Sequence, residues 1–85
     1  MELTTQFEQA AASSKTLAQK PDNETLLKLY SLYKQSTEGD VSGEVPSNPF
    51  DFVAKAKYNA WEAVKGMAKE TAMQEYIDLV TKLKG

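Results

Sequence analysis

Leu26-Leu27-Lys28-Leu29-Tyr30-Ser31-Leu32-Tyr33, residues 26–33 of an 85-residue chain, places six apolar or aromatic side chains in eight positions. That density is too high for a surface helix with one narrow apolar stripe. It is typical of a helix that is contacted by neighbours on two sides. The stretch therefore predicts a helix with packing partners on two of its faces.

The residues around this stretch indicate where its helix begins and ends. Pro21 cannot continue a preceding helix, and the Asp22 side chain can accept hydrogen bonds from the free N–H groups of a following one. Glu24 adds a negative charge in the first turn, where the helix dipole favours it. Gly39 closes the helix at its other end.

Apolar residues at spacings of three and four predict three more helices. One runs from Leu3 to near Lys20, one from Phe52 to Val64 with Gly66 as its stop, and one follows Gly66. The apolar positions are Phe7, Ala10, Ala11, Ser14, Leu17 and Ala18 in the first, Phe52, Ala56 and Ala60 in the third, and Met73, Tyr76, Ile77, Val80 and Leu83 in the fourth.

Residues 39–49 form the longest connection, because glycine and proline recur there among polar residues. A connection of this length can run along a whole helix, so the helices that it joins can lie parallel. The sequence has neither strand-like alternation nor an internal repeat. It predicts an all-α fold and a single domain over residues 1–85.

The composition excludes several classes of function. The chain has no cysteine and no histidine, so thiolate chemistry and the commonest general base are absent. No carboxylate pair or glycine-rich phosphate loop takes their place, and Asp40 with Glu44 offers too few oxygens for a metal site. We therefore expect neither an enzyme nor a metal protein.

Charge and hydropathy also limit the partners. The net charge is −2, with lysine as the basic residue throughout, and no apolar run approaches the length of a membrane span. We expect no nucleic-acid binding, no stable membrane association and no secretion signal, which together favour a cytoplasmic location. An anion site would have to be a local cluster of lysines.

Two groups of residues are candidates for such a site. Tyr30, Tyr33 and Lys34 share a helical face, on which phenol rings and an ammonium could hold a nucleotide phosphate and base. Lys57 lies four residues before Trp61 on another helix. Spacing alone favours a structural role instead, with core tyrosines, a solvated Lys34 and a Lys57 stem lying over tryptophan.

A longer set of residues resembles the acyl-CoA-binding protein family. The resemblance covers nearly the whole chain. It includes Pro21, Leu26, Leu29, Tyr30-Ser31, Tyr33-Lys34-Gln35-Ser36-Thr37, Gly39-Asp40, Pro46, Asp51-Phe52, Lys55-Ala56-Lys57, Ala60-Trp61, Lys65-Gly66, Ala72-Met73 and Tyr76-Ile77.

The resemblance implies a bundle of four helices in up-down-down-up order and a medium- to long-chain fatty-acyl-CoA ester as ligand. It implies a monomeric carrier that buffers and transports this ligand without a cofactor. The implied ligand-binding residues are Lys15, Tyr30, Ser31, Leu32, Tyr33, Lys34, Lys57 and Tyr76, with Lys57 at the 3′-phosphate. Phe7, Ala11 and Leu27 match positions that line the acyl path. The alternatives are a helical protein-interaction module without a small-molecule ligand and an enzyme acting on the same ester.

The chain departs from the family pattern at several positions. Val53 stands where many relatives carry a lysine, and Tyr58 replaces a common tryptophan. Ala68 lies where a serine often caps the fourth helix, and Asp22 follows Pro21 in place of a small residue. The segment between Pro46 and Asp51 is one residue longer. These differences bear on acyl-length preference and on local stability.

Overall fold

A computed structural model describes residues 2–41 and 51–84. In this part of the chain the secondary structure consists of four α-helices, as the sequence predicts. They are α1 (Leu3–Ser14), α2 (Asn23–Thr37), α3 (Phe52–Ala63) and α4 (Lys69–Lys84). Most of the predicted long connection, residues 42–50, lies outside the described residues.

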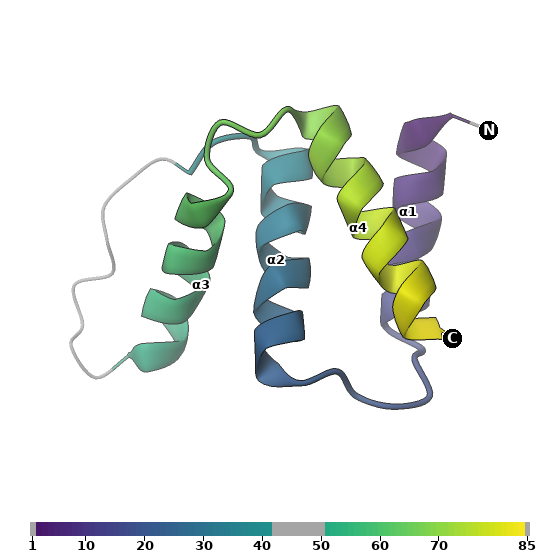
Figure 1. Cartoon of the computed structure of the whole chain (residues 1–85), viewed down its shortest axis with the longest axis horizontal. Helices are drawn as coiled ribbons and strands as arrows, with labels where there is room; N and C mark the ends of the chain where they lie inside the picture. The colour runs from purple at the N-terminus through teal and green to yellow at the C-terminus, as the bar shows by residue number, and fades with distance from the viewer. Residues whose placement is uncertain (1, 42–50, 85) are drawn as a thin grey trace.

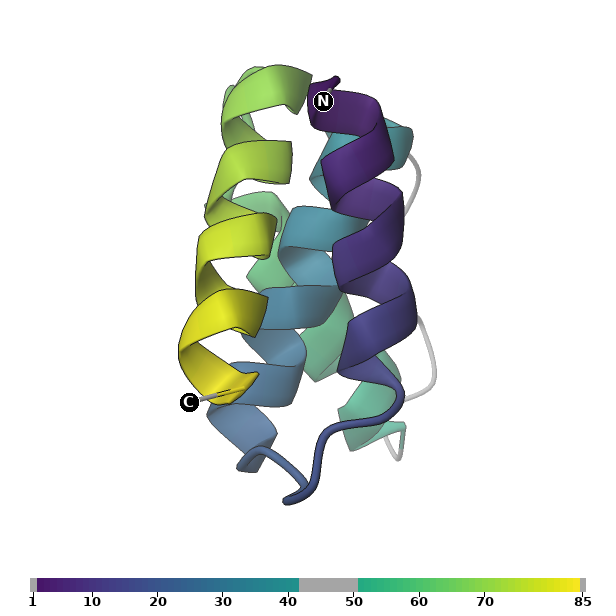
Figure 2. The ribbon, with the colours of Figure 1, turned by 90° about the vertical axis from the view of Figure 1, so that its right-hand side faces the viewer.

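The helices follow the up-down-down-up order that the family resemblance implies. In Figure 1, α1 and α4 run downward, whereas α2 and α3 both run upward although they follow one another in the chain. Figure 2 shows α1 and α4 in front of α2, with α3 behind it. Helix α2 therefore lies in the middle of the molecule, with α3 on one side and α1 and α4 on the other.

The predicted end of the first helix is wrong. We expected α1 to continue to near Lys20, but it ends at Ser14. The Ser14 hydroxyl donates to the Ala11 carbonyl at 2.7 Å, and the Thr16 N–H donates to the Ser13 carbonyl at 3.0 Å. Serine side chains compete with the backbone for helical carbonyls in this way, and the tighter turn ends the helix before Leu17.

The predicted boundaries of α2 are confirmed. The Asp22 carboxylate accepts a hydrogen bond from the Thr25 N–H at 2.7 Å, as expected of an N-cap. Gly39 follows the end of α2 with a φ of 84°, in the left-handed region that glycine adopts without steric cost.

The core lies where α4 packs against both α1 and α2. Helix α3 packs on the other side of α2, which confirms that α2 has partners on two faces. None of the described side chains of α3 is buried. The buried apolar residues come from the other three helices and are Phe7, Ala10, Leu29, Leu32, Ala72, Tyr76 and Val80.

Hydrogen bonds fix the C-terminal ends of α2 and α3 to each other. The buried Gln35 amide donates from Nε2 to the Met67 carbonyl at 2.7 Å and to the Asp40 carboxylate at 2.8 Å. Asp40 also accepts the Gly66 N–H at 2.7 Å. The Trp61 indole N–H donates to the Gly39 carbonyl at 2.9 Å. These polar contacts position α3 without a buried apolar side chain of its own.

We expect Gln35→Ala to lower the free energy of unfolding by about 1–3 kcal/mol, because two acceptors lose their donor and a buried amide is removed. Urea unfolding followed by circular dichroism measures this. The matched control is Gln74→Ala, since the Gln74 amide donates only to Asp78 on the exposed side of α4. The control should change stability by less than about 0.5 kcal/mol. Equal losses in the two variants would contradict this role for Gln35.

Asp40 should make the stability of the fold dependent on acid pH. The Gln35 amide and the Gly66 N–H hold its pKa below the ordinary aspartate value of 3.8. A lowered pKa contributes stability above the unfolded-state pKa, and this contribution is lost as the pH falls through the folded-state pKa.

Asp40→Asn keeps an acceptor oxygen but removes the charge. The melting temperature of wild type should therefore exceed that of Asp40→Asn near neutral pH, and the difference should shrink below about pH 4. Thermal melts over a pH series measure it, with Asp78→Asn as a control for removing an exposed carboxylate. A difference that stays constant across the series would refute the assignment.

Candidate functional site

Two open hollows lie on opposite sides of α2. The first, which we call the α1–α2 hollow, has a volume of about 520 Å³. The second, which we call the α2–α3 groove, has a volume of about 390 Å³. Residues of α1, α2 and α4 line the first, and residues of α2 and α3 line the second.

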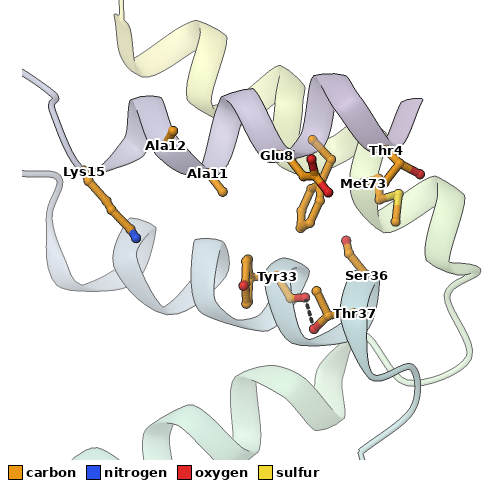
Figure 3. Close-up of a pocket in the computed structure, with 10 residues that line it drawn as sticks. Thr4, Glu8, Ala11, Ala12, Lys15, Tyr33, Ser36, Thr37 and Met73 are labelled. Carbon is orange, nitrogen blue, oxygen red and sulfur yellow. Dashed lines mark hydrogen bonds between the residues drawn. The ribbon is translucent and has the colours of Figure 1, made fainter. Parts of the chain in front are cut away.

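The α1–α2 hollow exists because α1 and α2 both pack on α4 while small side chains face the space between them. Figure 3 shows Ala11 on α1 pointing into the space between the helices, with Tyr33 and Ser36 on the facing side of α2. Lys15, directly after α1, points from the end of that helix toward α2. The remaining lining residues are Thr4, Phe7, Glu8, Thr37 and Met73.

Three aromatic rings connect the hollow to the core. The buried Phe7 ring stacks on Tyr33 with ring centroids 5.6 Å apart, and meets Tyr76 edge-on at 5.1 Å. Tyr33 is 42% exposed, so one face of its ring is supported while much of it stays accessible. An accessible, supported ring of this kind can stack a base or cover a flat ligand group.

The α2–α3 groove has a mainly apolar lining. Leu26 and Leu27 line it from α2, and Phe52, Val53 and Ala56 from α3. Phe52 is 73% exposed and Val53 is 64% exposed, although both are large apolar residues. Exposed apolar residues that rim a groove are typical of a ligand-binding surface. Asn23, Tyr30 and Lys57 complete the lining.

Two lysines and two aromatic rings form a cluster where the groove meets the C-terminal half of α2. The Lys57 Nζ lies 5.3 Å from the centroid of the Tyr30 ring. The Lys34 Nζ lies 5.9 Å from the same centroid and 5.8 Å from that of Trp61. Both ammonium groups can thus attract an anion beside an aromatic surface.

Lys34 also has a carboxylate partner. Its Nζ lies 2.6 Å from Oε2 of Glu38, the residue that caps the C-terminal end of α2. This hydrogen bond raises the pKa of Lys34 above the ordinary lysine value. Lys34 is therefore positively charged, and the negative charge of Glu38 partly neutralises it.

The structure brings most of the predicted site residues to these surfaces. Phe7, Ala11, Lys15 and Tyr33 line the α1–α2 hollow. Leu27, Tyr30 and Lys57 line the α2–α3 groove, and Lys34 joins the cluster. The Lys57 ammonium group lies over the Tyr30 ring, and it is the Lys34 ammonium group that lies over Trp61. The expectation that the Lys57 stem covers Trp61 stays a prediction.

Three predicted ligand residues are buried. Ser31 donates its hydroxyl to the Lys28 carbonyl at 2.8 Å, and Leu32 belongs to the core. The Tyr76 hydroxyl donates to Ser14 Oγ at 3.1 Å. In the described part of the chain they support neighbouring site residues, and direct ligand contact stays a prediction for each of them.

Sequence reasoning missed several lining residues that helical spacing could have found. Glu8 and Ala12 precede Lys15 by seven and three positions and therefore share its face. Leu26 precedes Tyr30 by four positions, and Val53 precedes Lys57 by four. Extending the predicted site residues along their helix faces would have identified them.

Other kinds of site are not found in the described residues. Residues 2–41 and 51–84 contain no group of three acidic side chains placed to hold a metal ion. Among the helices described, none combines the length and apolar content needed to cross a membrane.

Known proteins resemble this chain along most of its length. The family model described as "Acyl CoA binding protein" matches residues 4–80. The acyl-CoA-binding protein homolog 1 of Caenorhabditis elegans is 47% identical over 81 residues, which cover 95% of this chain and 93% of that protein. Sequence similarity therefore includes every element that lines the two hollows.

A solved structure has the same fold. The crystal structure of Oryza sativa acyl-CoA-binding protein 2 matches with a TM-score of 0.90 and 43% identity, covering 96% of this chain and 90% of that one. Enoyl-CoA delta isomerase 2 of Rattus norvegicus is 51% identical over 77 residues, or 91% of this chain, but the match covers only 19% of the isomerase.

Proposed function

Because this chain belongs to the acyl-CoA-binding protein family, we propose that it binds fatty-acyl-CoA esters on the surface that spans the α1–α2 hollow and the α2–α3 groove. The observation that carries the proposal is the cluster in which Lys34 and Lys57 flank the ring of Tyr30. It offers two cations and a π surface to one anionic, aromatic head group.

The head group of the ester requires cations that converge from separate elements. Lys15 follows α1, Lys34 lies on α2 and Lys57 lies on α3. A phosphate held between lysines gains charge-assisted hydrogen bonds from each of them. Tyr30 and Tyr33 provide ring faces next to these cations, which suits the stacking of an adenine.

The acyl chain requires an apolar surface that starts near the head group. The α2–α3 groove meets this requirement, because Tyr30 and Lys57 lie among leucine, valine and phenylalanine side chains. Leu27 is the predicted acyl-path residue that lines this groove. Phe7 and Ala11 line the α1–α2 hollow on the other side of α2, and their contact with the acyl chain stays a prediction.

We propose that binding leaves the ester chemically unchanged, and that the protein acts as a monomeric cytoplasmic carrier that buffers and transports medium- to long-chain esters. The absence of reaction is supported by the Caenorhabditis elegans relative, which matches over 93% of its length and is named for binding. Incubation with palmitoyl-CoA followed by mass spectrometry should recover intact ester. Hydrolysis or isomerisation of the ester would instead indicate an enzyme.

Affinity should rise with acyl length, because each methylene removed from water contributes about 0.8 kcal/mol until the groove is filled. Calorimetric titration with octanoyl-, dodecanoyl- and palmitoyl-CoA measures the increment. Free CoA and free palmitate should both bind far more weakly, since each lacks half of the recognised molecule. Equal affinity for palmitate and palmitoyl-CoA would refute the proposal. A helix-binding interaction module would bind none of these molecules.

Leu27→Asn should weaken the binding of palmitoyl-CoA by about fivefold, equivalent to about 1 kcal/mol of lost apolar contact. Binding of free CoA should change little, because the contact is with the acyl chain. Leu17→Asn is the matched control, since Leu17 is a half-buried leucine outside the groove. Thermal melts separate loss of fold from loss of binding. An equal effect of Leu27→Asn on free CoA and palmitoyl-CoA would place the acyl chain elsewhere.

A further inference from the structure

The Lys34–Glu38 ion pair places a carboxylate at the cation that the ligand needs. We propose that Glu38 competes with the phosphates of the ligand for the Lys34 ammonium and thereby weakens the affinity of this chain for acyl-CoA esters. The inference rests on the proposed function, because it assigns a role to a residue at the same site. Glu38 is outside the set of predicted site residues and lines neither hollow.

The geometry makes the carboxylate a direct competitor. Glu38 Oε2 lies 2.6 Å from Lys34 Nζ, which is the distance of a strong charge-assisted hydrogen bond. The same ammonium is within 6 Å of the Tyr30 and Trp61 ring centroids. A phosphate that approaches Lys34 from this aromatic side meets a cation that already donates to a carboxylate.

The other two site lysines differ in this respect. Within residues 2–41 and 51–84, Lys34–Glu38 is the one side-chain ion pair with a nitrogen–oxygen distance below 4.0 Å. No described carboxylate lies that close to the ammonium group of Lys15 or Lys57. Competition is therefore confined to the lysine on α2.

The phosphate still prevails in this exchange. A phosphate monoester carries a charge of about −1.5 to −2 at neutral pH, and it can accept from more than one lysine at once. Glu38 reaches Lys34 as an i, i+4 neighbour in a half-exposed pair, and such pairs are weak. The carboxylate therefore reduces the affinity without blocking the site.

The exchange also predicts an effect of salt. In wild type, Glu38 already neutralises Lys34, so ligand binding there releases few ions to solvent. In Glu38→Gln, Lys34 attracts solvent anions that the ligand must displace, and binding should depend more steeply on salt. Near 1 M salt the Debye length is about 3 Å, and the two proteins should then bind almost equally.

The experiment is calorimetric titration of wild type and Glu38→Gln with octanoyl-CoA and palmitoyl-CoA over a salt series. At low salt, Glu38→Gln should bind about two- to fivefold more tightly, the range expected for releasing an exposed ion pair. The gain should be the same for both esters, because the contact is with the head group. Circular dichroism melts confirm that both proteins are folded.

Two controls make the result specific to the ion pair. Glu75→Gln removes the same charge from an exposed position of α4 and should leave affinity nearly unchanged. In a Lys34→Ala background, Glu38→Gln should lose most of its gain. Equal gains from Glu38→Gln and Glu75→Gln, or a full gain without Lys34, would overturn the inference.

The outcomes also separate the inference from the proposed function. If wild type binds both esters but Glu38→Gln matches it at low salt, only the role of Glu38 is refuted. If wild type binds neither ester, the proposed function fails and the inference fails with it.

Discussion

The double hydrogen bond from the Gln35 amide determines how the two halves of the site meet. By donating to both the Met67 carbonyl and the Asp40 carboxylate, this side chain connects the end of α2 to the segment between α3 and α4. Asp40 extends the connection to the Gly66 N–H. No described side chain of α3 is fully buried, so these polar contacts and the Trp61 indole add to its half-buried packing on α2 in setting its position. The distance between Lys57 and Tyr30 follows from that position.

The same arrangement explains why the surface is open on both sides of α2. Helix α4 is the common partner of α1 and α2 and supplies Ala72, Tyr76 and Val80 to the core. Helices α1 and α2 are thereby held at a separation that small side chains do not fill, which leaves the α1–α2 hollow. On the other face, α2 and α3 leave the groove between their exposed apolar side chains. Core packing and ligand surface thus use different faces of the same helix.

The sequence predicted the number and type of the helices because apolar spacing and caps are local signals, whereas their up-down-down-up arrangement was implied by the family resemblance. Asp22 and Gly39 were correctly identified for that reason. The end of α1 was not predicted, because the apolar pattern continues to Ala18 while the hydroxyl of Ser14 ends the helix through a local hydrogen bond. For the site, Tyr30 and Tyr33 were predicted as one face, but they serve different hollows. Side chains three positions apart point in directions that differ by about 60° around a helix. The placement of α1 and α3 on opposite sides of α2 turns this difference into two separate candidate binding surfaces. Gln35 was recognised through family resemblance, and its structural role depends on Met67, which is distant in sequence.

The absence of buried side chains among the described residues of α3 has an evolutionary consequence. Substitutions in a core reduce stability through cavities or overpacking, so selection restricts them. The exposed α3 residues at the groove, Phe52 and Val53, are free of that restriction, whereas Trp61 is held by its hydrogen bond to Gly39. Two departures from the family pattern, Val53 and Tyr58, lie on this helix. Exposed positions of α3 can therefore vary at less cost to stability than core positions, and Val53 is one that also lines the proposed acyl groove.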